Sequence, residues 1–471
     1  MSLRNFNKQS QIAASSSVVF DWHGMPGVLE RLSPPWQSLE VIDRGEGVKE
    51  GSRVQLCARN GVFSFRWESL YRNVRPGEGF EEIQVSGPFR RWEHRHRFIG
   101  TEAGTSTLRD EIDYEFPANP FSESLLALPV GRKLDALFDH RHLISADDIV
   151  AFAKRRESGA APLKILVTGA SGLVGSALLP LLSSQGHQVL RAVRRPLLPG
   201  GLGEEVRWRP ESAADEISGP ERDAFEELDA VIHLAGENIA SGRWTPHRKE
   251  QLRESRIGVT RRLCELLSSL DSPPRSFLCA SAVGYYPTDR DEELDESVSP
   301  SDGFLGDLCR EWEAACEKLA GGQTRVVNMR IGVVLTPAGG ALKKMLTPFR
   351  LGLGGRLGNG EQSFSWISIE DLAQAILWLL AQDELSGPVN LTAPSPVSNR
   401  EFTDTLGAVL NRPTLLPVPA GLLRMIFGEM ANDLLLTGAR VIPARLIETD
   451  FPFRHPDLEN ALGQLLPHRT T

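Results

Sequence analysis

The feature that most constrains the fold is the stretch of residues 164–182, KILVTGASGLVGSALLPLL. A short apolar strand, KILV, leads into three glycines at the start of an apolar helix, and a second strand, HQVLRAV, follows at residues 187–193. Glycine allows a tight turn and a close approach to a pyrophosphate, and the helix N-terminus supplies amides that bind it. Glycines also occur in ordinary tight turns, but this order of elements predicts a dinucleotide site. Its expected contacts are Gly169, Ser171, Gly172, Leu173, Val174 and Gly175.

The end of the second strand indicates which dinucleotide is bound. Sites for NAD(H) usually carry Asp or Glu there, about 20 residues beyond the glycines, to bind the ribose hydroxyls. This chain has Arg194 and Arg195 instead. A guanidinium pair attracts a 2′-phosphate and can bind it in bidentate fashion. We therefore expect NADP(H), the alternative being two solvated arginines at a strand end.

The rest of the second half continues the same pattern. Buried strands such as AVIHLAG (230–236), SFLCASAVG (276–284) and VVNMRIGVVL (326–335) alternate with amphipathic helices. Continuous apolar strands of this kind are typical of a parallel sheet covered on both faces. The pattern predicts an α/β, doubly wound fold.

The first half has a different periodicity. Residues 41–116 mostly alternate between apolar and polar types, with turn residues between short runs, which indicates an antiparallel meander. A long helix is expected over about 120–142 and a second, short one to about 156. The run ESGAAP at 157–162 reads as a linker. We therefore expect one domain at 1–156 and another at 163–471.

Composition excludes several classes of protein. The 471 residues, 41% of them hydrophobic, suffice for two or three domains, and the net charge of -9 argues against a nucleic-acid partner. Five cysteines without a CxxC pair suggest neither a disulfide framework nor a zinc site. The first residues lack a signal-peptide pattern, and no apolar run is long enough to span a bilayer. We expect a cytoplasmic protein with no membrane partner.

Longer motifs carry a resemblance to a known family. These are GENIASGRWT (236–245), ESRIGVT (254–260), PFRLGLGGRLGNGEQSFSWISIEDL (348–372) and GEMANDLLLTGARVIPARL (428–446). With them, residues 163–466 resemble the extended short-chain dehydrogenase/reductases, and more narrowly the sugar-nucleotide epimerase-like subfamily. The resemblance implies a Rossmann-type sheet with a C-terminal, substrate-side subdomain, mainly residues 396–471.

The resemblance also implies roles for individual residues. Leu234, Ala235 and Gly236 would end the fourth strand beside the cofactor ribose and pyrophosphate. Ser281 takes the position of the serine that orients a substrate carbonyl or hydroxyl, or it is a satisfied strand-end hydroxyl. Two further cofactor contacts are expected at Arg256 and Arg330, for which buried ion pairs are the alternative.

The acid and the lysine of the family are missing. Its chemistry normally needs a tyrosine and, four residues later, a lysine that lowers the pKa of the phenol. On CREWEAACEKLA (309–320) the family pattern places Cys309 on the tyrosine, Glu313 on the lysine and Glu317 on a glutamate. Glu313 would raise the pKa of Cys309, which disfavours a thiolate nucleophile.

A nearby tyrosine is a candidate substitute for the missing acid. Tyr285 and Tyr286 follow Ser281 closely. We name Ser281 and Tyr286 as the candidate catalytic residues, with packing under the loop as the alternative for the tyrosines.

The first 145 or so residues resemble the START-like, polyketide-cyclase-like superfamily. The similarity rests on the order of elements and on WEHRHRFIG (92–100), TLRDEIDYEFP (107–117) and LFDHRH (137–142). It implies an α+β helix-grip domain whose cavity holds an apolar ligand. His94 and His96 share a strand face, but no third ligand is evident, so we expect no metal site. Asp110 and Asp113 are expected to face outward.

Three functions remain open at this point. The first is an NADP(H)-dependent epimerase or oxidoreductase acting on a nucleotide-linked sugar or another small hydroxyl or carbonyl compound. The second is a catalytically inactive protein that senses NADP(H) or binds a small ligand. The third makes the N-terminal domain the enzyme or carrier and the second half its regulator. A homodimer is expected from the resemblance.

Overall fold

The computed structural model describes residues 3–60, 63–117, 120–197, 201–211 and 219–467. The chain forms two compact units, which are described separately. One contains residues 1–162 and 180–187, and the other contains residues 163–179 and 188–471. In the parts of the chain described, no helix is both long and apolar enough to cross a membrane.

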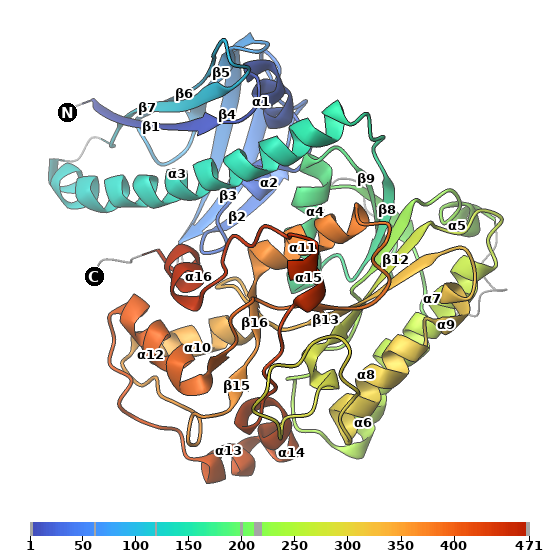
Figure 1. Ribbon diagram of the computed structural model, residues 1–471. Coiled ribbons are helices and arrows are strands. Elements are labelled where there is room, and N and C mark those ends of the chain that lie inside the picture. Colours follow the sequence, from blue (N-terminus) through green and yellow to red (C-terminus); the bar gives the residue numbers. More distant parts are fainter. Residues whose placement is uncertain (1–2, 61–62, 118–119, 198–200, 212–218, 468–471) are drawn as a thin grey trace. The chain divides into compact units, whose positions relative to one another are not determined.

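The N-terminal unit is built on a 7-stranded antiparallel sheet in the order β1-β7-β6-β5-β4-β3-β2 (Figure 1). Consecutive strands pair as neighbours from β2 to β7, which confirms the predicted meander. A strand that the sequence patterns did not indicate, β1, pairs with β7 and completes the sheet. The strands are β1 Arg4–Ile12, β2 Ser38–Asp43, β3 Arg53–Asn60, β4 Phe63–Arg75, β5 Gly79–Ser86, β6 Arg91–Gly100 and β7 Ser106–Glu115.

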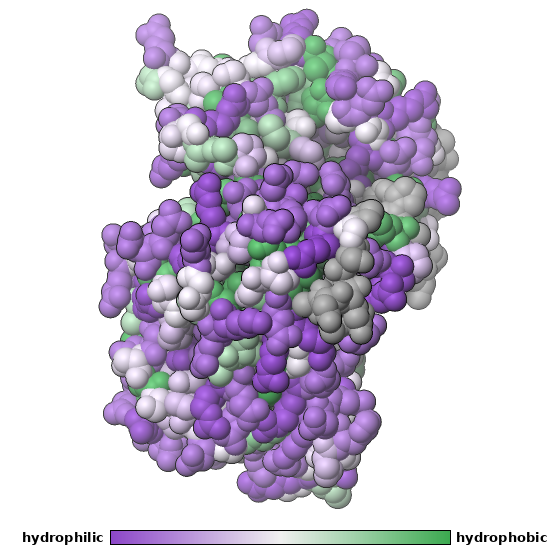
Figure 2. Space-filling view, turned by 90° about the vertical axis from the view of Figure 1, so that its right-hand side faces the viewer, coloured by the Kyte–Doolittle hydropathy of each residue, from purple (hydrophilic) through white to green (hydrophobic). Residues whose placement is uncertain are grey.

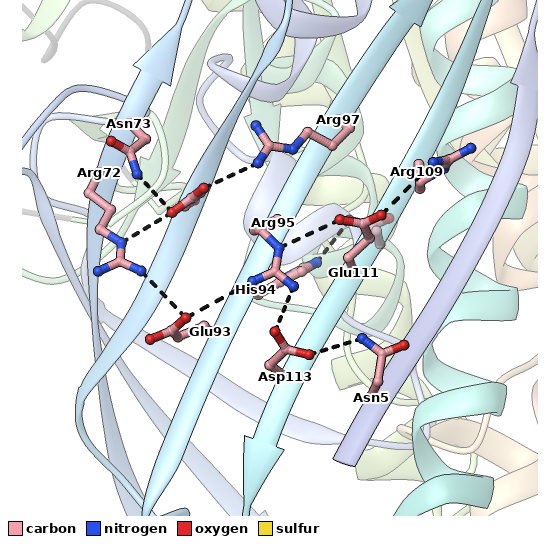
Figure 3. A network of polar contacts seen from close by, with 12 residues as sticks. Asn5, Arg72, Asn73, Glu93, His94, Arg95, Arg97, Arg109, Glu111 and Asp113 are labelled. Carbon is pink, nitrogen blue, oxygen red and sulfur yellow. Dashed lines mark hydrogen bonds and ion pairs between the residues drawn. The ribbon is translucent and has the colours of Figure 1, made fainter. Parts of the chain in front are cut away.

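The two faces of this sheet differ in chemistry. Along β6, His94, His96 and Phe98 are buried, whereas the residues between them are partly exposed. Figure 3 shows the outer side, where Arg95 reaches Asp113 at 2.7 Å and Glu111 at 3.5 Å. This alternation follows from the two-residue period of a strand and gives the sheet a charged outer face and an inner face that carries buried side chains.

Three helices accompany the sheet: α1 (Ser16–His23), α2 (Val28–Arg31) and α3 (Pro120–Glu157). The prediction of two helices after the sheet was wrong, because α3 continues through residue 142 to Glu157. No proline or glycine occurs between residues 132 and 158, so nothing in the sequence interrupts the helix there. Trp22, Phe98 and Phe152 belong to one buried core, which the helices and the sheet share.

The second unit contains a 7-stranded parallel sheet in the order β10-β9-β8-β11-β12-β13-β17. This confirms the doubly wound α/β fold. The strand order reverses between β8 and β11, where ligands bind in such sheets. The strands are β8 Lys164–Thr168, β9 Gln188–Val193, β10 Glu204–Arg207, β11 Ala230–His233, β12 Ser276–Ala282, β13 Arg325–Ile331 and β17 Gly387–Leu391.

Helices cover both faces of this sheet. The face that carries Leu166, Val231 and Phe277 packs against α7, α8 and α9 through a core that includes Leu263 and Trp312. In Figure 1, α4 and α11 lie on the other side of the sheet. The helices are α4 Leu173–Ser184, α5 Pro220–Asp223, α6 Pro246–Arg253, α7 Val259–Ser268, α8 Phe304–Ala314, α9 Glu317–Ala320 and α11 Ile369–Leu380; η2 (Glu254–Gly258) joins α6 to α7, and η3 (Val283–Tyr285) follows β12.

The C-terminal part adds short elements around a core of its own. Leu342, Phe402 and Leu462 bring α10, α12 and α16 together in that core. In Figure 2, one face of the molecule is mostly hydrophilic, with hydrophobic residues in separate small groups. The elements are β14 Val333–Leu335, α10 Gly340–Arg350, β15 Ser363–Phe364, β16 Trp366–Ser368, β18 Val397–Ser398, α12 Asn399–Leu410, α13 Ala420–Phe427, α14 Glu429–Ala431, η4 Asn432–Leu436, α15 Ala444–Glu448 and α16 Leu458–Leu465.

Candidate active site

The glycine loop between β8 and α4 has the backbone that a pyrophosphate cradle requires. Gly169 has a φ of 66°, and a Cβ there would lie 2.7 Å from the carbonyl of Leu234. A Cβ on Gly175 would lie 2.5 Å from the carbonyl oxygen of Gly169. Both positions therefore exclude any larger residue, since Cβ atoms do not approach other atoms so closely. The loop and the first turn of α4, with Ser171, Gly172, Leu173 and Val174, fit the predicted cofactor site.

The two arginines at the end of β9 differ in their surroundings. Arg195 donates two hydrogen bonds to Glu205, at 2.6 and 2.8 Å, and is thereby tied to β10. Arg194 is exposed. Its guanidinium is therefore the better placed of the two for a 2′-phosphate.

A buried polar network supports the loop that follows β11. Thr168 Oγ1 lies 2.7 Å from Nδ1 of His233, whose Nε2 lies 3.0 Å from the hydroxyl of Thr260. Trp312 donates to that same hydroxyl at 3.0 Å, and the amide of Ala235 donates to Thr168 at 3.3 Å. Burial lowers the pKa of His233 to about 4, so this imidazole is neutral at pH 7. The network joins β8, β11, α7 and α8 beneath Leu234, Ala235 and Gly236.

The polar centre of the candidate active site is formed by Ser281, Glu313 and Arg330. Ser281 and Arg330 are register partners on β12 and β13. Ser281 Oγ donates to Glu313 Oε1 at 2.6 Å, and Arg330 donates to both carboxylate oxygens at 2.9 Å. Burial lowers the pKa of Arg330, but the hydrogen bonds and charge of Glu313 outweigh it and raise that pKa overall. The negative charge at the family's lysine position is thus neutralised from the adjacent strand.

Tyr286 is buried in this structure, with 1% of its surface exposed. Its hydroxyl donates to Asn390 Oδ1 at 2.7 Å and accepts from Arg330 at 2.9 Å. Burial raises its pKa to about 12, despite the opposing effect of Arg330. Its neighbour Tyr285 is only partly buried, and its ring lies 3.4 Å from the guanidinium carbon of Arg330. This geometry favours a positioning role for Tyr286.

Cys309, at the family's acid position, is not activated as a nucleophile. Cys309 is buried, and burial together with the charge of Glu313 raises its pKa to about 12. The thiol is therefore protonated at neutral pH and is a poor nucleophile. Helix α8 ends at Ala314, so Glu317 begins the separate short helix α9. Glu317 therefore lies on a different helix from Cys309 and Glu313.

Arg256 and Arg330 both have partners within the protein. Arg256 donates to the carbonyl of Glu237 at 2.8 Å and lies over the ring of Trp312, 5.2 Å from its centroid. Arg330 is held by Glu313 and Tyr286. These contacts favour structural roles for both arginines over direct cofactor contacts, although Arg330 is bonded to protein groups of the active site.

Comparisons with known proteins identify the family. The model described as NAD dependent epimerase/dehydratase family matches residues 165–391. An epimerase family protein of Mycobacterium bovis is 45% identical over 309 residues, which are 65% of this chain and 97% of the relative. The chain belongs to the epimerase family. Two further family models match this epimerase-family chain: polyketide cyclase / dehydrase and lipid transport at 12–141, and a domain of unknown function, DUF1731, at 418–465.

Two solved structures resemble this epimerase-family chain. One is described as the nucleoside-diphosphate sugar epimerase from Corynebacterium glutamicum, with a TM-score of 0.78, 29% identity and coverage of 98% of this chain and 90% of that one. The other is the human epimerase family protein SDR39U1 with NADPH, with a TM-score of 0.58, 36% identity and coverage of 64% and 99%. The first spans both units, which confirms the helix-grip and Rossmann-type combination.

Sequence reasoning missed two residues of the candidate site. Asn390, at the end of β17, accepts from Tyr286 and donates to the carbonyl of Ile442 at 2.9 Å. Glu296 accepts a hydrogen bond from the backbone N–H of Asn390 at 2.9 Å, and burial raises the pKa of Glu296. Both residues belong to no local motif, so no spacing in the sequence could have indicated them.

Proposed function

We propose that this chain is an NADP(H)-binding epimerase or oxidoreductase that acts on a nucleotide-linked sugar or a similar small hydroxyl or carbonyl compound. The observation that carries the proposal is the glycine loop at the reversal of strand order, with exposed Arg194 at the end of β9. The human relative whose structure contains NADPH supports the same cofactor. Arg194 would contact the 2′-phosphate.

The residues of the site have separate roles in this proposal. A bound nicotinamide would supply or accept a hydride. Because the Ser281 proton is directed to Glu313, the lone pairs of Ser281 Oγ are available to a substrate hydroxyl. As that hydroxyl is oxidised, its proton passes to Ser281 Oγ and the Ser281 proton passes to Glu313, so that protons balance. Arg330 positions the carboxylate of Glu313, and Tyr286 positions the loop that follows β12.

Turnover tests the proposed chemistry. We expect a panel of nucleotide sugars and small carbonyl compounds to contain one that the full chain epimerises or reduces with NADPH. Replacement of Ser281→Ala should lower kcat by about a hundredfold or more, as loss of general acid-base catalysis does. Ser272→Ala, an exposed serine just before the other end of β12, should leave kcat unchanged. Equal activity of the Ser281→Ala variant would contradict the role of Ser281.

A second candidate function is a binding protein that senses NADP(H) without turnover. It is favoured by Cys309 and Glu313, which replace the tyrosine and lysine of the family. The thiol of Cys309 is protonated, and the carboxylate of Glu313 is hydrogen-bonded to Ser281 and Arg330. Tight NADPH binding together with no turnover across the panel would select this function and reject the enzyme.

A further inference from the structure

A buried cluster of imidazoles and carboxylates lies inside the N-terminal unit. His94 and His96 of β6 and Asp110 of β7 face inward, and Glu82 of β5 is the register partner of His94. His142 reaches the cluster from α3. The expectation that Asp110 faces outward was wrong, because Asp110 is only 4% exposed.

Asp110 holds three imidazoles in place. Its Oδ1 lies 2.8 Å from Nε2 of His94 and 2.7 Å from Nδ1 of His96. Its Oδ2 lies 2.8 Å from Nε2 of His142, whose Nδ1 is 2.7 Å from the hydroxyl of Ser10. A carboxylate behind histidine side chains is the usual outer partner of metal ligands, since it fixes the orientation of each ring.

His96 lies between the carboxylates of Asp110 and Glu82, which it meets at angles that are poor for hydrogen bonds. It is 7% exposed, and neither of its ring nitrogens makes a hydrogen bond of acceptable direction, although carboxylate oxygens are near both. Its Nε2 lies 3.6 Å from Oε1 of Glu82. A buried nitrogen that is close to oxygens but misaligned with them is costly, unless another atom completes its contacts.

Glu82, His94 and His96 lie close enough together to share a metal ion. One ligand atom from each lies within 4.8 Å of the others. Ligands at about 2.0–2.2 Å from a zinc ion are separated from each other by about 3.3–3.6 Å, a range that includes the 3.6 Å between His96 and Glu82. Two imidazoles and one carboxylate are a common ligand set for zinc and similar ions, and they leave a coordination position open.

Aromatic rings pack against both imidazoles of this cluster. The ring of Phe80 stacks on His96 at 4.2 Å between centroids, and Phe138 meets His94 edge-on at 5.3 Å. Glu82 also interacts with the hydroxyl of Tyr71 and with the buried guanidinium of Arg141.

We infer that Glu82, His94 and His96 bind a divalent transition-metal ion, with Asp110 as the outer partner that orients both histidines. An oxygen or nitrogen of a small ligand would complete the coordination of such an ion. This site is independent of the nucleotide site of the other unit and of the function proposed for it.

Metal titration of the full chain tests the inference. After dialysis against a chelator, Co²⁺ should bind in a ratio of one per chain, with the visible absorption of a four- or five-coordinate ion, and Zn²⁺ should displace it. Glu82→Gln and His96→Asn should each weaken Co²⁺ binding by more than about a hundredfold, because loss of an outer partner alone costs 10–100-fold.

Two matched variants control for nonspecific effects. Glu81→Gln removes the neighbouring carboxylate on the outer face of β5, and His247→Asn removes an exposed histidine of α6. Both should bind Co²⁺ as the unmodified chain does. Circular dichroism should show that Glu82→Gln is folded, since its side chain is partly exposed. An unmodified chain that binds no Co²⁺, or a folded Glu82→Gln variant that binds it equally well, would overturn the inference.

Discussion

Glu313 illustrates how a single residue can depart from its family and still be accommodated. A carboxylate replaces the expected ammonium, and Arg330 on the adjacent β13 contacts both of its oxygens. The side chains of Arg330 and Glu313 are only 3% and 12% exposed, so each charge depends on the other. The pair also fixes the acceptor of the Ser281 hydroxyl.

Removal of one partner should therefore be costly. We expect Arg330→Met to lower the free energy of unfolding by about 3 kcal/mol or more, because it leaves a buried carboxylate without its partner. The double variant Arg330→Met with Glu313→Leu should recover part of that loss. Arg310→Met, which breaks an exposed pair with Asp307, should change stability by less than about 0.5 kcal/mol. Urea unfolding measures all three, and equal losses at Arg330 and Arg310 would refute the argument.

Side-chain direction explains which site residues could be predicted. The glycines of the loop and Arg194 follow local motifs, so the sequence alone could name them as candidates. Asp110 shares its strand face with Leu108 and Ile112, so the two-residue period already indicated an inward carboxylate. Asn390 and Glu82 reach their clusters only through strand pairing, which no local pattern contains.

At the scale of elements, the loops after β8 and β11 depend on each other. Gly169 packs against Leu234, and the hydrogen bonds of Thr168, His233 and Thr260 link these strands to α7. The sequence predicted these two strands. It did not predict this network, because its members are separated by 65 and 27 residues.

The network predicts a dependence of stability on pH. The pKa of His233 is about 4 when folded and about 6.5 when unfolded, so its contribution is complete above pH 6.5 and declines as the pH falls toward 4. Between pH 7.5 and pH 5 this histidine should account for a loss of about 2 kcal/mol. Urea unfolding of His233→Gln should show a pH dependence smaller by that amount. The exposed His247→Gln should behave as the unmodified chain, and an unchanged dependence in His233→Gln would contradict the assignment.

The first turn of α4 gives a second prediction at this scale. Gly175→Ala places a Cβ in contact with the backbone of Gly169 and should weaken NADPH binding by at least about tenfold, since the loop must open. Gly463→Ala in α16 meets no atom within 4 Å and should stabilise its helix by up to about 1 kcal/mol without affecting binding. Calorimetric titration with NADPH measures the affinity of both variants. Binding by Gly175→Ala at normal affinity would show that the loop does not hold the pyrophosphate.

At the scale of the whole molecule, two units with different periodicities contain two chemically different candidate sites. The change from alternating to continuous apolar strands indicated both folds, because strand burial on one or two faces sets that pattern. The strand order of each sheet and the polar interior of the N-terminal unit needed the structure. The candidate nucleotide site depends on a loop that is local in the sequence, whereas the cluster around Asp110 depends on long-range contacts among β5, β6, β7 and α3.

The most direct test of the nucleotide site is calorimetric titration of the full chain with NADPH and NADH. The chain should bind NADPH at least about tenfold more tightly than NADH, and Arg194→Ala should remove that preference, because a charged hydrogen bond contributes about 1.5–3 kcal/mol. Arg310→Ala, on the exposed side of α8, should retain it. Tighter binding of NADH, or an unchanged preference in Arg194→Ala, would contradict the assignment of this chain as an NADP(H)-binding member of its family.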